Sequence, residues 1–100
     1  MKKIILLCAG GMSTSVLVNN MKKEAASLNY DCYIEAFAVD AAAKVAADAD
    51  CVLLGPQISY KLDDVKKEIT CPVESIDMSA YGMMNGKKVL QQARKLMGDN

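Results

Sequence analysis

Histidine and tryptophan are absent from the 100 residues of this chain, and its acidic and basic residues cancel to a formal net charge of zero. Without histidine, the chain has no imidazole for a metal site, a catalytic triad or a pH switch. A neutral chain also has no long-range electrostatic attraction to nucleic acid or to anionic lipid. We therefore expect no metal site and no nucleic-acid partner.

Long hydrophobic runs are also missing. The longest clean apolar run, residues 4–10, is far shorter than the roughly 20 residues that a membrane-spanning helix needs. The opening "MKKIILLCAGG" imitates a signal peptide, but glycines and hydroxyls interrupt its apolar stretch too early. The sequence thus predicts a cytoplasmic protein that does not insert into the membrane itself.

The four cysteines form no Cys-x-x-Cys pair, which excludes zinc-ribbon and thioredoxin-type sites. A disulfide framework is not expected either, because 52% of the residues are hydrophobic and can form an ordinary core in a cytosolic chain. Length and composition predict a single domain over residues 1–100.

Hydrophobic periodicity predicts strands and helices in strict alternation. Strands are expected at residues 3–8, 30–39, 51–54 and 72–76. Helices are expected at 13–28, after a capping Asp40, around Leu62 to Ile69, and from Asn85 to a stop at Gly98. Leu28 is assigned to the buried side of the first helix, and Asn29 to its end. This pattern predicts an α/β fold with one open four-stranded parallel sheet, in the order 2-1-3-4, and helices on both faces.

In that strand order, the crevice between the carboxyl ends of the first and third strands is the expected ligand site. Two loops border this crevice, residues 8–15 and Gly55-Pro56-Gln57. The first loop begins at Cys8 and contains Gly10 and Gly11, which let the backbone approach a ligand closely. It then enters a helix, whose first N–H groups have no partner within the helix and attract anions.

Three hydroxyls, of Ser13, Thr14 and Ser15, can add donors to this anion site, although Ser13 can instead cap the helix. A helix N-terminus favours the thiolate form of a nearby cysteine, so Cys8 is a candidate nucleophile. The alternative is that Cys8 is simply a small buried hydrophobe, which is the interpretation we adopt for Cys32, Cys51 and Cys71. Because Cys51 and Cys71 lie at the opposite ends of their strands, they are too far from Cys8 for a disulfide.

Nucleotide-binding loops are excluded by their spacing. A Walker loop needs a Gly-Lys-Ser/Thr ending, and no lysine lies between Lys3 and Lys22. The dinucleotide pattern Gly-x-Gly-x-x-Gly needs a third glycine that is absent here. We therefore expect no cofactor.

Three segments, "CAGGMSTS", "LLGPQISY" and "SAYGMMNGKKVL", give the chain a family resemblance over essentially its whole length. It resembles the enzyme IIB component of the bacterial sugar phosphotransferase system, of the lactose/cellobiose/chitobiose type. The resemblance implies a phosphoryl carrier that forms phosphocysteine at Cys8. The donor would be a phosphohistidine of the IIA partner, and the acceptor a sugar bound by the membrane protein IIC. The implied phosphate-binding residues are Ala9, Gly10, Gly11, Met12, Ser13, Thr14 and Ser15.

Two alternatives remain. The loop also resembles that of low-molecular-weight tyrosine phosphatases and arsenate reductases, whose pattern is Cys-x5-Arg. Here the sixth residue after Cys8 is Thr14, and the first arginine is Arg94. Without an arginine to stabilise charge in the transition state, hydrolysis should be slow, as a carrier requires. A non-enzymatic regulatory module that only binds phosphate is the second alternative, although receiver domains have aspartate where this chain has Cys8.

For some residues outside the first loop, the sequence allows two interpretations. Gln57 and Ser59 either contact the phosphoryl group or close a turn. Tyr81, Met83 and Met84 follow the fourth strand and belong either to a docking surface or to the core. The lysines of the later helices are expected to be solvated.

Overall fold

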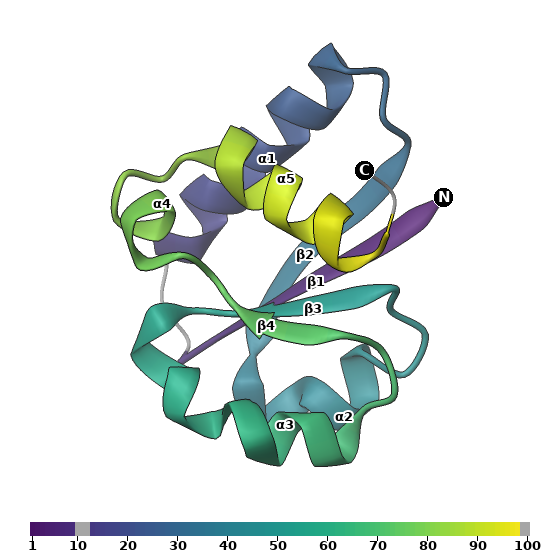
Figure 1. Cartoon of the computed structure of the whole chain (residues 1–100), viewed down its shortest axis with the longest axis vertical. Coiled ribbons are helices and arrows are strands. Elements are labelled where there is room, and N and C mark those ends of the chain that lie inside the picture. Colours follow the sequence, from purple (N-terminus) through teal and green to yellow (C-terminus); the bar gives the residue numbers. More distant parts are fainter. Residues whose placement is uncertain (10–12, 99–100) are drawn as a thin grey trace.

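The sheet is described by a computed structural model that covers residues 1–9 and 13–98. Its strands are all parallel and lie in the order β2-β1-β3-β4, which confirms the predicted topology. The strands are β1 (Lys2–Cys8), β2 (Cys32–Ala38), β3 (Cys51–Leu54) and β4 (Val73–Ser75). Their carboxyl ends point to the left in Figure 1.

Helices cover both faces of the sheet, as predicted. The helical elements are α1 (Ser13–Ser27), η1 (Val39–Ala41), α2 (Ala42–Val45), η2 (Pro56–Lys61), α3 (Leu62–Glu68), α4 (Met78–Gly82) and α5 (Gly86–Leu96). In Figure 1, α1, α4 and α5 lie above the sheet, on what we call the α1 face, and α2 and α3 lie below it, on the α3 face. Over residues 1–9 and 13–98, no helix combines the length and apolar character needed to cross a bilayer.

The central strand β1 explains why the sequence opens with an uninterrupted apolar run. Successive side chains of a strand point to opposite faces. Ile4 and Leu6 accordingly pack in the core of the α1 face, and Ile5 and Leu7 in the core of the α3 face. All four are fully buried, as expected for a strand that is covered on both sides.

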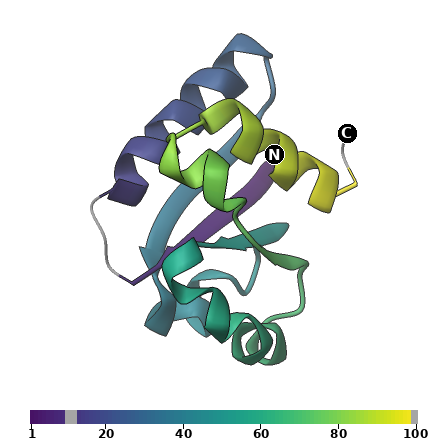
Figure 2. The ribbon, with the colours of Figure 1, turned by 60° about the vertical axis from the view of Figure 1, so that its left-hand side comes forward.

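Helices α1 and α5 pack side by side on the α1 face, in the views of both Figure 1 and Figure 2. Their contact side chains, among them Leu17 and Met21 of α1 and Leu90 of α5, are fully buried. Both predicted boundary residues are confirmed. Asn85 caps α5 by accepting a hydrogen bond from the Lys88 amide at 3.1 Å, and Asn29 has the left-handed backbone, with φ at 53°, that ends α1.

Three details of the predicted fold are wrong. Asp40 caps no helix, because the chain leaves β2 directly into the turn η1 and α2 starts without a side-chain cap. Leu28 is exposed, because α1 ends at Ser27 and the left-handed Asn29 turns the chain away. The short helix α4 was not predicted, although its cap is visible in the sequence: Asp77 accepts a hydrogen bond from the Ala80 amide at 2.9 Å.

Candidate functional site

Cys8 is the last residue of β1 and lies at the carboxyl edge of the sheet, as predicted. It pairs in register with Ala38 of β2, and it shares the α1 face with Ile4 and Leu6 because the three alternate along the strand. Cys8 is buried, with 6% of the residue exposed. The thiol donates a weak hydrogen bond to the carbonyl oxygen of Phe37, with a sulfur–oxygen distance of 3.7 Å.

Helix α1 begins at Ser13, five residues after Cys8 and on the same face of the sheet. The first N–H groups of a helix have no partner inside it, and with the helix dipole they favour an anion. Gly10, Gly11 and Met12, which belong to the predicted phosphate loop, lie outside the described residues.

The described residues of that loop differ in exposure. Ala9 and Ser15 are exposed, whereas the side chain of Thr14 is buried, with 1% of the residue accessible. The Thr14 hydroxyl lies 3.3 Å from the phenol oxygen of Tyr81, within hydrogen-bonding distance. This contact turns the Thr14 hydroxyl toward the core. Thr14 can therefore present its backbone amide to a ligand while its hydroxyl is occupied.

The second predicted loop lies directly beside Cys8. The Gly55 amide donates a hydrogen bond of 2.9 Å to the carbonyl of Leu7, and this bond continues the pairing of β3 with β1. A Cβ atom at position 55 would lie 3.9 Å from the Cys8 Cβ and 3.1 Å from the carboxamide oxygen of Gln57. The side chains of Cys8 and Gln57 thus flank the same backbone position. Ser59 is exposed within η2.

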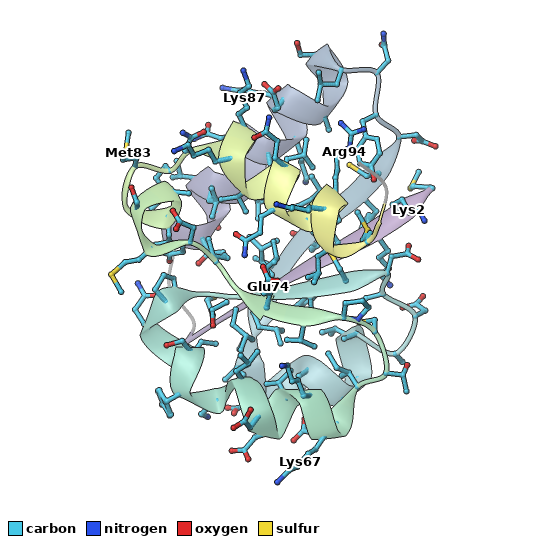
Figure 3. All side chains as sticks on the ribbon, in the orientation of Figure 1. Lys2, Lys67, Glu74, Met83, Lys87 and Arg94 are labelled. Carbon is cyan, nitrogen blue, oxygen red and sulfur yellow. The ribbon has the colours of Figure 1, made fainter. Side chains whose placement is uncertain are left out.

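Tyr81, Met83 and Met84, which the sequence could not assign, have different environments. Tyr81 belongs to the core of the α1 face, and Met84 packs against that core. Met83 is 72% exposed and points outward from α4 at the left of Figure 3, the side where the strands end. Other large apolar side chains that follow the strand ends are also exposed. Together with Met83 they form what we call the apolar rim: Val16, Tyr60, Met78 and Met83.

The other three cysteines lie at the opposite edge of the sheet, at or just before the amino ends of their strands. All four cysteines are free. Burial raises the pKa of Cys51 to about 12 and, with smaller contributions from neighbouring charges, also raises the pKa of Cys32 and of Cys71. A raised pKa keeps these thiols protonated and therefore poor nucleophiles at neutral pH.

Two features of the site could not be found from the sequence. The acceptor for the Cys8 thiol is a backbone carbonyl of β2, which no residue type marks. The partner of Thr14 is Tyr81, which lies 67 positions further along the chain. The available signal was the segment "SAYGMMNG", which stands out without indicating a role.

Comparison with known proteins places the chain in a family. The model of the family described as "PTS system, Lactose/Cellobiose specific IIB subunit" matches residues 3–92. The chain is 47% identical, over 97% of both sequences, to the oligo-beta-mannoside-specific EIIB component of the PTS system of Bacillus subtilis.

Two further relatives extend the comparison. The solution structure of the cellobiose-specific phosphotransferase IIB component from Borrelia burgdorferi superposes with a TM-score of 0.80 at 37% identity, and the match covers 98% of this chain and 93% of that one. The lactose-specific EIICB component of the PTS system of Lactococcus lactis is 34% identical over 65% of this chain, which corresponds to 11% of that longer protein.

Proposed function

The chain belongs to the lactose/cellobiose-specific IIB family of the sugar phosphotransferase system, and from this we propose that it is a phosphoryl carrier whose phosphorylated residue is Cys8. The single observation that supports Cys8 is its position. It ends the central strand, shares a face with the start of α1, and lies next to Gly55 and Gln57. The three other cysteines lie at the opposite edge of the sheet, where burial keeps them protonated.

The proposed chemistry has two transfers. In the first, the Cys8 sulfur attacks the phosphorus of a phosphohistidine on IIA. The P–N bond breaks, an S–P bond forms, and the thiol proton ends on the released imidazole. In the second, a sugar hydroxyl bound by IIC attacks the same phosphorus. The S–P bond then breaks, an O–P bond forms, and the hydroxyl proton ends on the Cys8 sulfur.

The same backbone amides can stabilise Cys8 both before and after it is phosphorylated. Amides of residues 9–15 and the start of α1 would hold three phosphoryl oxygens by hydrogen bonds that need no charged side chain. The donor imidazole belongs to IIA, which is compatible with a chain that has no histidine. We propose that the carboxamide nitrogen of Gln57 adds a further donor from the second loop, because the Gln57 side chain and Cys8 both lie beside Gly55.

Arginine placement favours a carrier over a phosphatase. Phosphatases with the Cys-x5-Arg loop hold an arginine where this chain has the buried Thr14. The single arginine, Arg94, instead lies over the ring of Tyr30, with its guanidinium carbon 4.5 Å from the ring centroid. Tyr30 precedes β2 at the amino edge of the sheet. At roughly 3.3 Å per residue, Tyr30 lies about 26 Å along the chain from Ala38, the residue of β2 that pairs with Cys8. A phosphoryl group on Cys8 would therefore be hydrolysed slowly.

The proposed partners are IIA, which donates, and membrane-embedded IIC, which holds the sugar, so this chain acts in the cytoplasm. The apolar rim supplies an adaptable docking surface on segments that follow the carboxyl ends of the strands, because exposed methionines and tyrosine suit contacts with more than one partner. A relative named as a combined C and B component is consistent with IIC as the neighbour. The proposed sugars are of the cellobiose, chitobiose or lactose class.

The test is intact-protein mass spectrometry after incubation with phosphoenolpyruvate, the general phosphotransferase proteins and IIA. We expect one added phosphate, mapped to Cys8, and its loss after addition of IIC and sugar. Cys8→Ser should remain folded and take no phosphate, whereas the matched control Cys71→Ser should be phosphorylated like the natural protein.

Other results would support the alternatives. Relay of phosphate to sugar by Cys8→Ser would overturn the assignment. Rapid turnover of an aryl phosphate would indicate a phosphatase. Phosphate binding that is unchanged in Cys8→Ser, without any covalent adduct, would indicate a regulatory module.

A further inference from the structure

The segment from α4 to the start of α5 makes three contacts with α1, one at the first turn of α1 and two further along it. At the first turn of α1, the hydroxyl of Thr14 meets the phenol of Tyr81 at 3.3 Å. Two turns later, the Asn20 carboxamide donates a hydrogen bond of 2.9 Å to the carbonyl of Met84. At the same level, Gly86 lies so close that a Cβ there would be 2.6 Å from the Met21 amide nitrogen. Residues 81–86 thus follow the N-terminal half of α1, as Figure 2 shows for α4 and α1.

The contact at the first turn differs from the packing around it. Leu17, Val18 and Met21 bury α1 against the sheet, but apolar packing is not directional and tolerates small shifts along the helix axis. The Thr14–Tyr81 contact is directional and nearly inaccessible to solvent, with 1% and 7% of the two residues exposed. Buried hydroxyls keep a partner because leaving one unpaired is costly. This contact therefore fixes where α1 begins.

The beginning of α1 is also where the proposed phosphoryl group binds. Amide donors stabilise a transferring phosphoryl group only when they are held at hydrogen-bonding distance from its oxygens. A displacement of about 1 Å can reduce a rate about 100-fold. A small movement of Thr14 would move these amides relative to Cys8, even with the fold intact.

We propose that Tyr81 is a positioning residue, which acts through the Thr14 hydroxyl to hold the N-terminal amides of α1 at the distance that phosphoryl transfer at Cys8 requires. This inference rests on the proposed phosphoryl carrier function. Tyr81 itself need not touch the phosphoryl group, and its side chain serves from the core. It gives the segment "SAYGMMNG" a role in the chemistry in addition to that of its exposed Met83.

The test measures phosphorylation of Cys8 by phospho-IIA in rapid-mixing experiments. Tyr81→Phe and Thr14→Val each remove one hydroxyl and keep the shape of the side chain. We expect each variant to reduce the maximal rate of transfer about tenfold, within the range expected for displaced donors, with little change in the IIA concentration at half-saturation. Thr14→Ser keeps the hydroxyl and should restore most of the rate.

Coupling distinguishes positioning from general destabilisation. The double variant Tyr81→Phe/Thr14→Val should be no slower than the slower single variant, because both changes break the same contact. Tyr33→Phe is the matched control, since Tyr33 is half-exposed at the amino end of β2, and it should transfer at the natural rate. Thermal unfolding of every variant verifies that it is folded at the assay temperature.

Two outcomes would overturn the proposal. One is a natural transfer rate in Tyr81→Phe, whatever its melting temperature, and the other is multiplication of the two single effects in the double variant. The unchanged protein in the same assay separates this failure from that of the function itself. If the natural chain takes phosphate on Cys8 and the variants equal it, only the role of Tyr81 is lost.

Discussion

The two faces of the sheet bury similar apolar side chains but hold their helices in different ways. On the α1 face, Asp77 caps α4 and Asn85 caps α5 with side-chain hydrogen bonds. Gln92 of α5 adds a third attachment, because its carboxamide bonds both the Asp77 amide, at 3.2 Å, and the Ser75 carbonyl, at 2.8 Å. On the α3 face, η1, α2, η2 and α3 all begin without a side-chain cap.

Directional contacts are therefore concentrated on the face that receives the chain after Cys8. The core of the α3 face consists of apolar residues such as Ala42, Val65 and Ile69, which need only to be covered. On the α1 face, the proposed phosphoryl transfer requires the start of α1 to be held at a set position beside the Cys8 thiol, and hydrogen bonds and close backbone contacts can provide that precision. The comparison implies that the α1 face is the less tolerant one.

Gly86→Ala is the substitution expected to have the largest effect on stability. A Cβ at position 86 would lie 2.6 Å from the Met21 nitrogen and 2.7 Å from the Asn20 carbonyl oxygen, both backbone atoms that cannot rotate away. Helices α1 and α5 must then separate. Overpacking of this kind costs about 1–3 kcal/mol, and the better helix propensity of alanine recovers up to about 1 kcal/mol. We expect a net loss of about 2 kcal/mol in the free energy of unfolding, measured by urea denaturation.

Gly82→Ala is the matched control for this prediction. Gly82 ends α4 on the same face, and a Cβ there would meet no atom within 4 Å. Its unfolding free energy should change by no more than about 0.5 kcal/mol. Equal stability of the two variants would show that α1 and α5 can adjust their spacing, and the contrast between the faces would lose its strongest support.

Alkaline pH offers a second comparison, between a cysteine from each core. Burial raises the pKa of Cys51, on the α1 face, to about 12. Burial also raises the pKa of the half-buried Cys71, which packs against the α3 face. In the unfolded chain, both thiols ionise near their ordinary pKa. Above about pH 9 the unfolded state therefore loses a proton that folded Cys51 retains, so stability present below that pH is lost as the pH rises.

Cys51→Val removes this contribution. Urea denaturation between pH 8 and pH 10.5 should show natural stability falling more steeply than that of the variant, by up to roughly 1.4 kcal/mol per pH unit. The lysines titrate in both proteins, so their effect cancels in the difference. Cys71→Val should flatten the curve less. A natural protein and a Cys51→Val variant with parallel pH profiles would contradict the assignment of Cys51 to a dry core.

The sequence predicts the long helices α1 and α5 and the strands well for a physical reason. Long amphipathic helices and buried strands contain enough apolar positions for their period to be recognised, and Asn85 adds a cap signal at the start of α5. Short elements are missed because a five-residue helix such as α4 contains hardly more than one turn, too little to show a hydrophobic period. Asp40 was misassigned because a capping residue type does not reveal whether its backbone is extended, as a cap requires.

In the candidate site, too, some contacts could be predicted from the sequence and others could not. Cys8 and Gly55 could be brought together from the sequence, because parallel strands in the order 2-1-3-4 place their carboxyl ends side by side. The contact of Thr14 with Tyr81 could not be predicted, since it depends on where α4 sits relative to α1. Hydroxyls in a phosphate-binding pattern suggest ligand contacts, and only the packing reveals that the hydroxyl of Thr14 faces the core.

Removing a cap on each face is the mildest test of the comparison. Asn85→Ala deletes the acceptor for the Lys88 amide at the start of α5 and should cost about 1 kcal/mol in the free energy of unfolding, a typical value for a lost cap. Asp40→Ala changes an exposed residue of η1 that caps no helix, so its effect should stay within about 0.5 kcal/mol. Urea denaturation with an unchanged m-value measures both. If Asp40→Ala proved as costly as Asn85→Ala, the α3 face would also depend on directional contacts, and precise positioning would no longer distinguish the face that receives the chain after Cys8.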